Sequence, residues 1–150
     1  MPESFLLGNS DGDRLEIEVV ARQHPDKADY WDGNWVTAYV TVVAQPWSGS
    51  YEADLRTDEF AGFRDALHRL HGDASLTEAR FDALEPWLNF VLRRTDRLGH
   101  VEVRGEARHS FLAGHNVLNF VLELDQTYIQ PALDGLDAIL REFPVRGSPE

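Results

Sequence analysis

Histidines are the side chains of this sequence that most readily bind a metal ion or transfer a proton near neutral pH, and the chain has six of them. His68 and His71 lie three residues apart in a segment with helical period, so both imidazoles could reach one metal ion. No third ligand is signalled, and both flank an apolar stripe, which favours ordinary histidines over a metal site. The same interpretation is favoured for His109 and His115, which could pair with each other or with His100 around a predicted hairpin loop. We therefore expect no metal ion and no cofactor.

Carboxylates at nearby alternate positions recur in segments with strand period. Such a pair could in principle carry out the acid–base chemistry of glycoside hydrolysis. Side chains two apart on a strand point the same way, however, and this is also how a sheet keeps one face in water. No apolar surroundings that would raise a carboxyl pKa are visible, and the sequence has no phosphate loop, nucleophile elbow or zinc-protease helix. Solvated strand faces are therefore favoured over a catalytic dyad. The pairs are Glu16 and Glu18, Glu52 and Asp54, Glu102 and Glu106, and Glu123 and Asp125.

Aromatic residues crowd a short turn-like segment, DYWDGNW, at positions 29–35. Its glycine and asparagine tolerate the positive φ that turns often require. Tyr30, Trp31 and Trp35 could grip a ligand, form a hot spot for a protein partner, or anchor the loop to the core. Because Trp35 begins a predicted strand, we expect it to anchor the loop, and we expect Trp31 to lie at or near the surface.

Seven segments have the alternating apolar pattern that predicts strands. In RLEIEVVA, for example, apolar residues alternate with glutamates. Pro46 and the small residues after it break the ladder between the second and third segments, which predicts a hairpin. Trp47 and Trp87 each adjoin a proline near the start of a strand, which predicts positions at the rim of the core. The predicted strands span 14–21, 35–44, 50–56, 74–81, 86–94, 99–109 and 116–125.

Two segments have an apolar stripe with helical period. The first runs from Asp58 to Gly72, with Thr57 as its expected cap, and the second spans 131–143 and opens on a proline. At an offset of 69 residues, the apolar positions of the strand and helix that end each half coincide. The order of elements predicts an α+β fold of mostly antiparallel sheet with two helices. The offset leaves open a pseudo-duplicated unit of four strands plus a helix.

The length of 150 residues predicts a single domain, 1–150, with an ordered core over about 4–144 and a frayed tail over 145–150. The absence of cysteine excludes disulfides and thiolate metal sites, and it fits a reducing compartment. The chain shows no signal peptide and no apolar run of transmembrane length, so we expect a cytoplasmic protein. The formal net charge of −12 repels nucleic acid and anionic membranes and attracts basic proteins. We therefore expect no direct binding to nucleic acid or membranes.

Several longer stretches follow one another in an order that resembles the WapI family of bacterial immunity proteins. The resemblance extends from about Leu15 to Val145 and is specific as a series. It implies a small cytoplasmic protein that binds and blocks the toxic C-terminal domain of a contact-dependent toxin, in that family a nuclease acting on RNA. It carries no binding residue over to this sequence. The stretches are YWDGNW, EADLRTDEFAGFRDAL, EPWLNF, HVEVRGEAR, LNFVLELDQTY and the closing REFPV.

The leading hypothesis is a non-enzymatic inhibitor of a basic toxin domain, because aromatic residues among acids supply a desolvated ring with a charged rim. Two alternatives stay open. One is a homo-oligomeric scaffold or interaction module. The other is an enzyme acting on a carbohydrate or small molecule, with Trp31 as a stacking platform and Glu52 or Glu102 as its carboxylate. The candidate contacts with the toxin are Asp29, Tyr30, Trp31, Asp32, Glu52 and Asp54.

Overall fold

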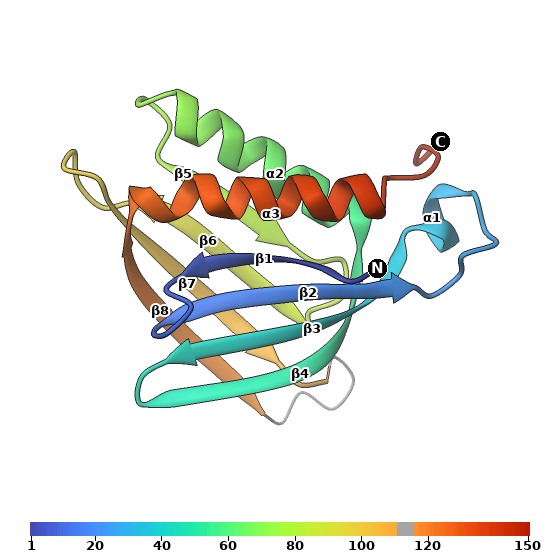
Figure 1. The fold of residues 1–150 in the computed structure, drawn as a ribbon, viewed down its shortest axis with the longest axis horizontal. Coiled ribbons are helices and arrows are strands. Elements are labelled where there is room, and N and C mark those ends of the chain that lie inside the picture. Colours follow the sequence, from blue (N-terminus) through green and yellow to red (C-terminus); the bar gives the residue numbers. More distant parts are fainter. Residues whose placement is uncertain (111–115) are drawn as a thin grey trace.

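The computed structural model describes residues 1–110 and 116–150, so the predicted pairing of His115 lies outside the described residues. Two four-stranded antiparallel sheets face each other, as Figure 1 shows. Each sheet is a meander in which strands consecutive in sequence pair with one another. The first sheet consists of β1 (Glu3–Gly8), β2 (Arg14–Arg22), β3 (Trp35–Ala44) and β4 (Trp47–Arg56), and the second of β5 (Glu78–Asp82), β6 (Leu88–Arg94), β7 (His100–Arg108) and β8 (Val117–Asp125).

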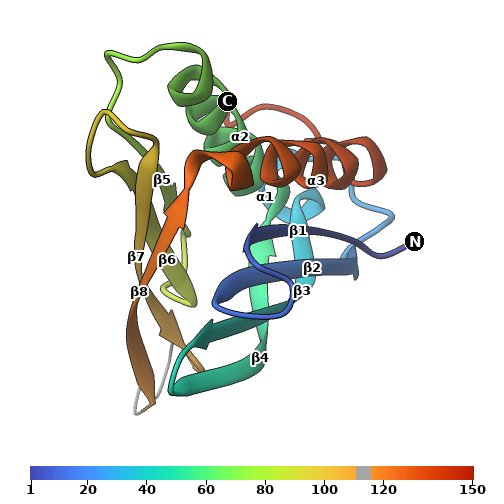
Figure 2. The ribbon, with the colours of Figure 1, turned by 60° about the vertical axis from the view of Figure 1, so that its left-hand side comes forward.

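Two long helices lie side by side across one end of the two sheets. Figure 2 shows the two sheets as separate layers. Each of these helices follows the last strand of a sheet and buries one apolar stripe against the core. The first packs on β5 and the second on β1, so each helix contacts the sheet that it does not follow. The helices are the short α1 (Tyr30–Gly33), α2 (Thr57–Gly72) and α3 (Ile129–Glu142), which the 3₁₀ turn Gln126–Tyr128 precedes.

The core lies between the inner faces of the sheets and beneath the helices. Along β3, Val36, Ala38 and Val40 are fully buried while the residues between them face outward, as a period of two requires. At the centre, five phenylalanine rings from β1, α2, β5 and β6 contact each other with centroids 4.9–6.2 Å apart. These five are Phe5, Phe60, Phe63, Phe81 and Phe90.

The predicted α+β class and the unit of four strands plus a helix are confirmed. The offset of 69 residues superimposes β4 on β8 in sequence and α2 on the segment that contains α3. The chain therefore repeats one architectural unit, and the helix of each unit packs mainly on the sheet of the other unit. Within the part of the chain that the structure describes, no helix combines the length and the apolar character needed to cross a bilayer.

Two sequence predictions about the first sheet are wrong. The strand β1 was missed because only Phe5 and Leu7 alternate clearly in so short a segment. The third predicted strand begins earlier, at Trp47, because the turn is confined to Gln45 and Pro46, whose peptide bond is cis. That early start places Trp47 next to the turn of the hairpin, paired with Ala44, with 67% of its surface exposed rather than at the rim of the core.

Two helical glycines provide a test of this packing. A Cβ on Gly135 of α3 would lie 2.7 Å from Phe5 Cα and from the Ser4 carbonyl oxygen of β1, whereas a Cβ on Gly62 of α2 would meet nothing within 4 Å. We expect Gly135→Ala to lower the free energy of unfolding by about 1–3 kcal/mol, because a close-packed backbone must move apart. We expect Gly62→Ala to raise it by about 0.5–1 kcal/mol, because alanine is the better helix former. Urea denaturation measures both, and equal effects would contradict the close contact of α3 with β1.

Candidate functional site

The aromatic segment between β2 and β3 folds as α1, not as a turn with positive φ. Asp29 precedes α1 in an extended conformation, and its Oδ2 accepts a hydrogen bond from Asp32 N at 3.0 Å, which caps the helix. Neither Gly33 nor Asn34 adopts a positive φ. Glycine is required at position 33 for another reason: a Cβ there would lie 2.6 Å from the Lys27 carbonyl oxygen.

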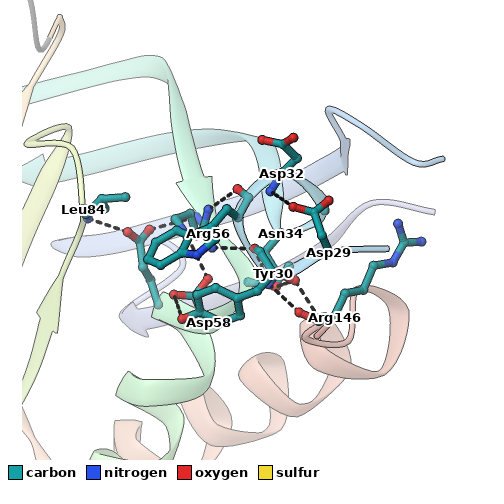
Figure 3. A network of polar contacts seen from close by, with 12 residues as sticks. Asp29, Tyr30, Asp32, Asn34, Arg56, Asp58, Leu84 and Arg146 are labelled. Carbon is teal, nitrogen blue, oxygen red and sulfur yellow. Dashed lines mark hydrogen bonds and ion pairs between the residues drawn. The ribbon is translucent and has the colours of Figure 1, made fainter. Parts of the chain in front are cut away.

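A buried cation explains why the aromatic residues gather at α1. Arg56, the last residue of β4, is 1% exposed, and its guanidinium donates to the carbonyl oxygens of Trp31 at 2.7 Å and Tyr30 at 2.8 Å. It also pairs with Asp58 Oδ1 at 3.0 Å (Figure 3). The rings of Tyr30, Trp31 and Trp35 lie around it, with centroids 5.0–5.3 Å from Cζ, a cation–π arrangement. We call Tyr30, Trp31, Trp35, Arg56 and Asp58 the Arg56 cluster.

A buried amide ties this cluster to the end of the chain. The side chain of Asn34 donates to the carbonyl oxygens of Tyr30 and Arg146, and its Oδ1 accepts from Thr57 Oγ1 and Arg146 N, all at 2.8–3.0 Å. Arg56 occupies the N-cap position of α2, so Thr57 is the first residue of the helix and not its expected cap. The Thr57 hydroxyl donates to Asn34 instead. Arg146 also donates to the carbonyl oxygen of Pro25 at 2.9 Å. The start of the tail, expected to fray, is thus held against the loop before α1.

A carboxyl in the first turn of α2 links this region to the second sheet. Glu59 Oε1 accepts from Arg56 N at 2.8 Å, and Oε2 accepts from Leu84 N, in the β5–β6 loop, at 2.5 Å. Burial raises the pKa of Glu59 to about 7, although the two N–H donors act in the opposite direction. Both oxygens bond the main chain, so the role that these contacts support for Glu59 is structural.

The outward-pointing side chains of the first sheet form an acidic surface around one exposed tyrosine. The strand register places Tyr39 of β3 between Glu18 of β2 and Glu52 of β4, with Asp54 two residues further along β4. Tyr39 is 46% exposed. Among the described residues, no arginine or lysine forms an ion pair with any of these three acids. We call Glu18, Tyr39, Glu52 and Asp54 the acidic face.

The outer face of the second sheet has a different charge pattern. Its strands carry their own arginines, which neutralise three glutamates through ion pairs at 2.5–3.5 Å. Three acids of this sheet, Asp82, Glu123 and Asp125, are exposed and form no ion pair among the described residues. The two sheets differ in that three glutamates of the second sheet have an arginine partner, whereas none of the three acids of the acidic face has one. The pairs are Glu78 with Arg80 and Arg93, Glu102 with Arg104, and Glu106 with Arg108.

The six predicted contact residues fall into two groups. Asp29 caps α1, and Tyr30 is half-buried with its hydroxyl bonded to Asp58 Oδ2 at 3.0 Å, so both hold the loop in place. The predictions for the two tryptophans are confirmed, since Trp31 is 54% exposed while Trp35 packs half-buried on Arg56. Asp32, Glu52 and Asp54 complete the set; Asp32 and Glu52 are exposed and Asp54 is half-buried.

The Arg56 cluster joins these groups spatially, because Arg56 and Asp54 share one side of β4. Sequence reasoning overlooked Arg56 and Tyr39 as features of this region. The alternation along β3 does place Tyr39 on the wet face, and that signal could have found it. No local signal marks Arg56 as buried, because the two carbonyl oxygens that accept its hydrogen bonds lie 25 and 26 residues away.

The histidines that the structure describes do not converge on a site. His68 and His71 are both exposed on α2, and His100 Nδ1 lies 2.5 Å from Asp96 Oδ2. Among residues 1–110 and 116–150, no group of three or more histidine, aspartate or glutamate side chains could hold a metal ion. His109 lines a groove between the first residues of β4 and the first residues of β8.

The sequence matches the model of a known protein family, and the structure aligns with two solved structures. The model of the family described as "Immunity protein WapI-like family" matches residues 5–144. No curated protein matches the sequence. A solved structure, the "CdiA-CT/CdiI toxin and immunity complex from Enterobacter cloacae", has a chain with 13% identity and a TM-score of 0.43, and the match covers 92% of this chain and 99% of that one. A chain of Trypanosoma MRP1/MRP2 has 9% identity and a TM-score of 0.38 over 95% and 98% of the two chains.

The Arg56 cluster predicts a large effect on stability. Arg56→Met removes the buried cation together with its hydrogen bonds to Asp58 and to two carbonyl oxygens, so we expect the free energy of unfolding to fall by about 3 kcal/mol. Arg93→Met, in an arginine that is 54% exposed, should change it by no more than about 0.5 kcal/mol. Urea denaturation compares the two variants. Similar losses in both would show that Arg56 does not organise this region.

Glu59 predicts a specific dependence of stability on pH. Because its folded pKa is raised from 4.5 to about 7, the folded state binds the proton more tightly than the unfolded state, and this contribution to stability falls as pH rises through that window. The free energy of unfolding of the wild type minus that of Glu59→Gln should therefore fall by about 3 kcal/mol between pH 4 and pH 8. Chemical denaturation across this range measures the difference. A difference that stays constant with pH would contradict the raised pKa.

Proposed function

Because this chain belongs to the WapI-like immunity protein family, we propose that it binds the toxic domain of a cognate contact-dependent toxin and neutralises it by stoichiometric blocking. In this proposal the toxin domain is a basic nuclease, and the protein acts in the cytoplasm without a cofactor and without catalysis. A blocking protein needs a rigid surface of complementary shape and charge, not an active site.

One observation carries the proposal: the acids of the acidic face form no ion pair among the described residues, whereas three glutamates on the outer face of the second sheet pair with arginines of their own sheet. A nuclease holds phosphates on a basic surface. An inhibitor with a concentrated acidic face can occupy that surface and associate with it quickly. The uneven distribution of ion pairs supports binding on one side of the molecule rather than a general role of the acids in solubility.

The six contact residues expected from the sequence are proposed as part of this interface. Trp31 would supply an apolar ring, and Asp32, Glu52 and Asp54 would supply the charge around it. Asp29 and Tyr30 would act mainly by holding α1 against Arg56. The backbone of α1 is fixed by hydrogen bonds from Arg56, so Trp31 would reach a partner with little loss of loop entropy.

The other hypotheses have less support. The enzyme hypothesis combined Trp31 with Glu52 or Glu102, but Glu52 and Glu102 lie on the outer faces of different sheets, and Glu102 is paired with Arg104. Self-association has one observation in its favour, because Trp47 is 67% exposed beside the free edge of β4. Light scattering distinguishes it, since a stable homodimer without affinity for a basic toxin domain would favour the scaffold.

The proposal predicts tight binding that depends on salt. The purified C-terminal domain of the cognate toxin should bind with 1:1 stoichiometry, and its association rate should fall about tenfold or more between 50 and 500 mM salt. Trp31→Ala should weaken binding by about 2 kcal/mol, as expected for an aromatic hot spot. Leu98→Ala, in a leucine that is 83% exposed in the loop between β6 and β7, is the control and should have no effect. Surface plasmon resonance measures all three, and an absence of binding by the wild type would refute the proposed function.

A further inference from the structure

A shallow hollow of about 260 Å³ opens beside the acidic face. It lies where the end of β2, the start of β3 and the end of β4 meet the β5–β6 loop. Its volume is below the roughly 300–1,000 Å³ that is typical of small-molecule sites. The hollow therefore suits a single side chain of a partner better than a free ligand. Its lining residues are Gln23, His24, Trp35, Asp54 and Glu85.

The chemistry of the lining suits a cation. Asp54 and Glu85 bring two carboxylates together from separate sheets, Trp35 adds an indole ring, and the lining contains no arginine or lysine. Each carboxylate is oriented by a neutral donor: Gln23 Nε2 bonds Asp54 Oδ1 at 2.7 Å, and Trp87 Nε1 bonds Glu85 Oε1 at 3.3 Å. These bonds fix the carboxylates and add no positive charge, so their electrostatic attraction remains available to an incoming cation.

The nearest buried cation does not neutralise this hollow. Arg56 lies against the ring of Trp35, but its guanidinium pairs with Asp58 and donates to two carbonyl oxygens of α1. No ion pair joins Arg56 to Asp54 or Glu85 in the part of the chain that the structure describes. The Arg56 cluster thus forms a rigid wall for the hollow while its own charge is compensated elsewhere.

We propose that this hollow receives an arginine or lysine side chain of the toxin domain, an inference that rests on the proposed function and assigns it a specific subsite. Arginine fits best, because its planar guanidinium can stack on an indole and bond carboxylates at the same time. The row of Glu18, Tyr39 and Glu52 beside the hollow then faces the basic surface around that side chain. The hollow holds the bound partner, and the row speeds its arrival.

The double variant Asp54→Asn/Glu85→Gln tests the hollow, because it removes both charges and retains acceptors for Gln23 and Trp87. The matched control is Glu102→Gln/Glu123→Gln, which removes two charges from neighbouring positions on β7 and β8 of the second sheet. The probe is the purified C-terminal domain of the cognate toxin, and its binding is measured by stopped-flow association and by surface plasmon resonance.

We expect the hollow variant to raise the dissociation rate about tenfold or more, because a desolvated charge pair acts mainly on dissociation. The control should change that rate less than about twofold. A double-mutant cycle that combines the hollow variant with alanine at each arginine and lysine of the toxin domain should show strong coupling at one position. Circular dichroism confirms that the variants are folded.

Three results would overturn the inference. If the hollow variant dissociates like the wild type, or if the control is weakened equally, the toxin domain binds elsewhere and the proposed function stands. If coupling is absent at every basic residue, no cation occupies the hollow. If the wild type itself does not bind, the proposed function fails, and the inference fails with it.

Discussion

The buried guanidinium of Arg56 is the constraint around which this protein is arranged. A cation that is 1% exposed is tolerated only where acceptors surround it, and the chain provides them from three places. Two main-chain carbonyls come from α1, and a carboxylate comes from the first turn of α2. Aromatic rings come from α1 and from the start of β3. Because these groups must meet at one point, α1 lies against the end of β4 and α2 departs from the same point.

Other contacts extend this arrangement across the molecule. Asn34 connects α1 with the first residue of α2 and with the chain end, and Glu59 connects α2 with the β5–β6 loop. These two side chains join segments that belong to different repeats of the fold. The surface beside them, which includes Trp31 and Asp54, is consequently built on fixed backbone, which is what a high-affinity protein interface requires.

The distribution of arginine accounts for the contrast between the two sheets. Between Trp35 and Arg56 the chain has no basic residue, and the one that ends this stretch turns into the Arg56 cluster. The second sheet instead carries arginines at outward positions beside its glutamates. The acidic face therefore forms no ion pair among the described residues, whereas three glutamates of the second sheet pair with arginines of that sheet. For a member of an immunity protein family, this asymmetry is the feature that relates the fold most directly to binding.

The periodic features were readable from the sequence because they depend on neighbours two, three or four residues away. They predicted seven of the eight strands, both long helices and the repeat at 69 residues. The sequence also predicted that Trp31 lies at the surface and that Trp35 anchors the loop. The strand β1 and the exposure of Trp47 were not readable, because a short edge strand and the length of a turn depend on what packs beside them. The contacts around Arg56 and Asn34 were also not predictable, since Arg56 bonds Tyr30 across 26 residues and Asn34 bonds Arg146 across 112. Composition fixed how many acids this protein has, and several ion pairs of the second sheet join residues only two apart on one strand. The tertiary structure alone decided that Arg56 is buried away from the acidic face, because the carbonyl oxygens that accept its hydrogen bonds come from a distant segment.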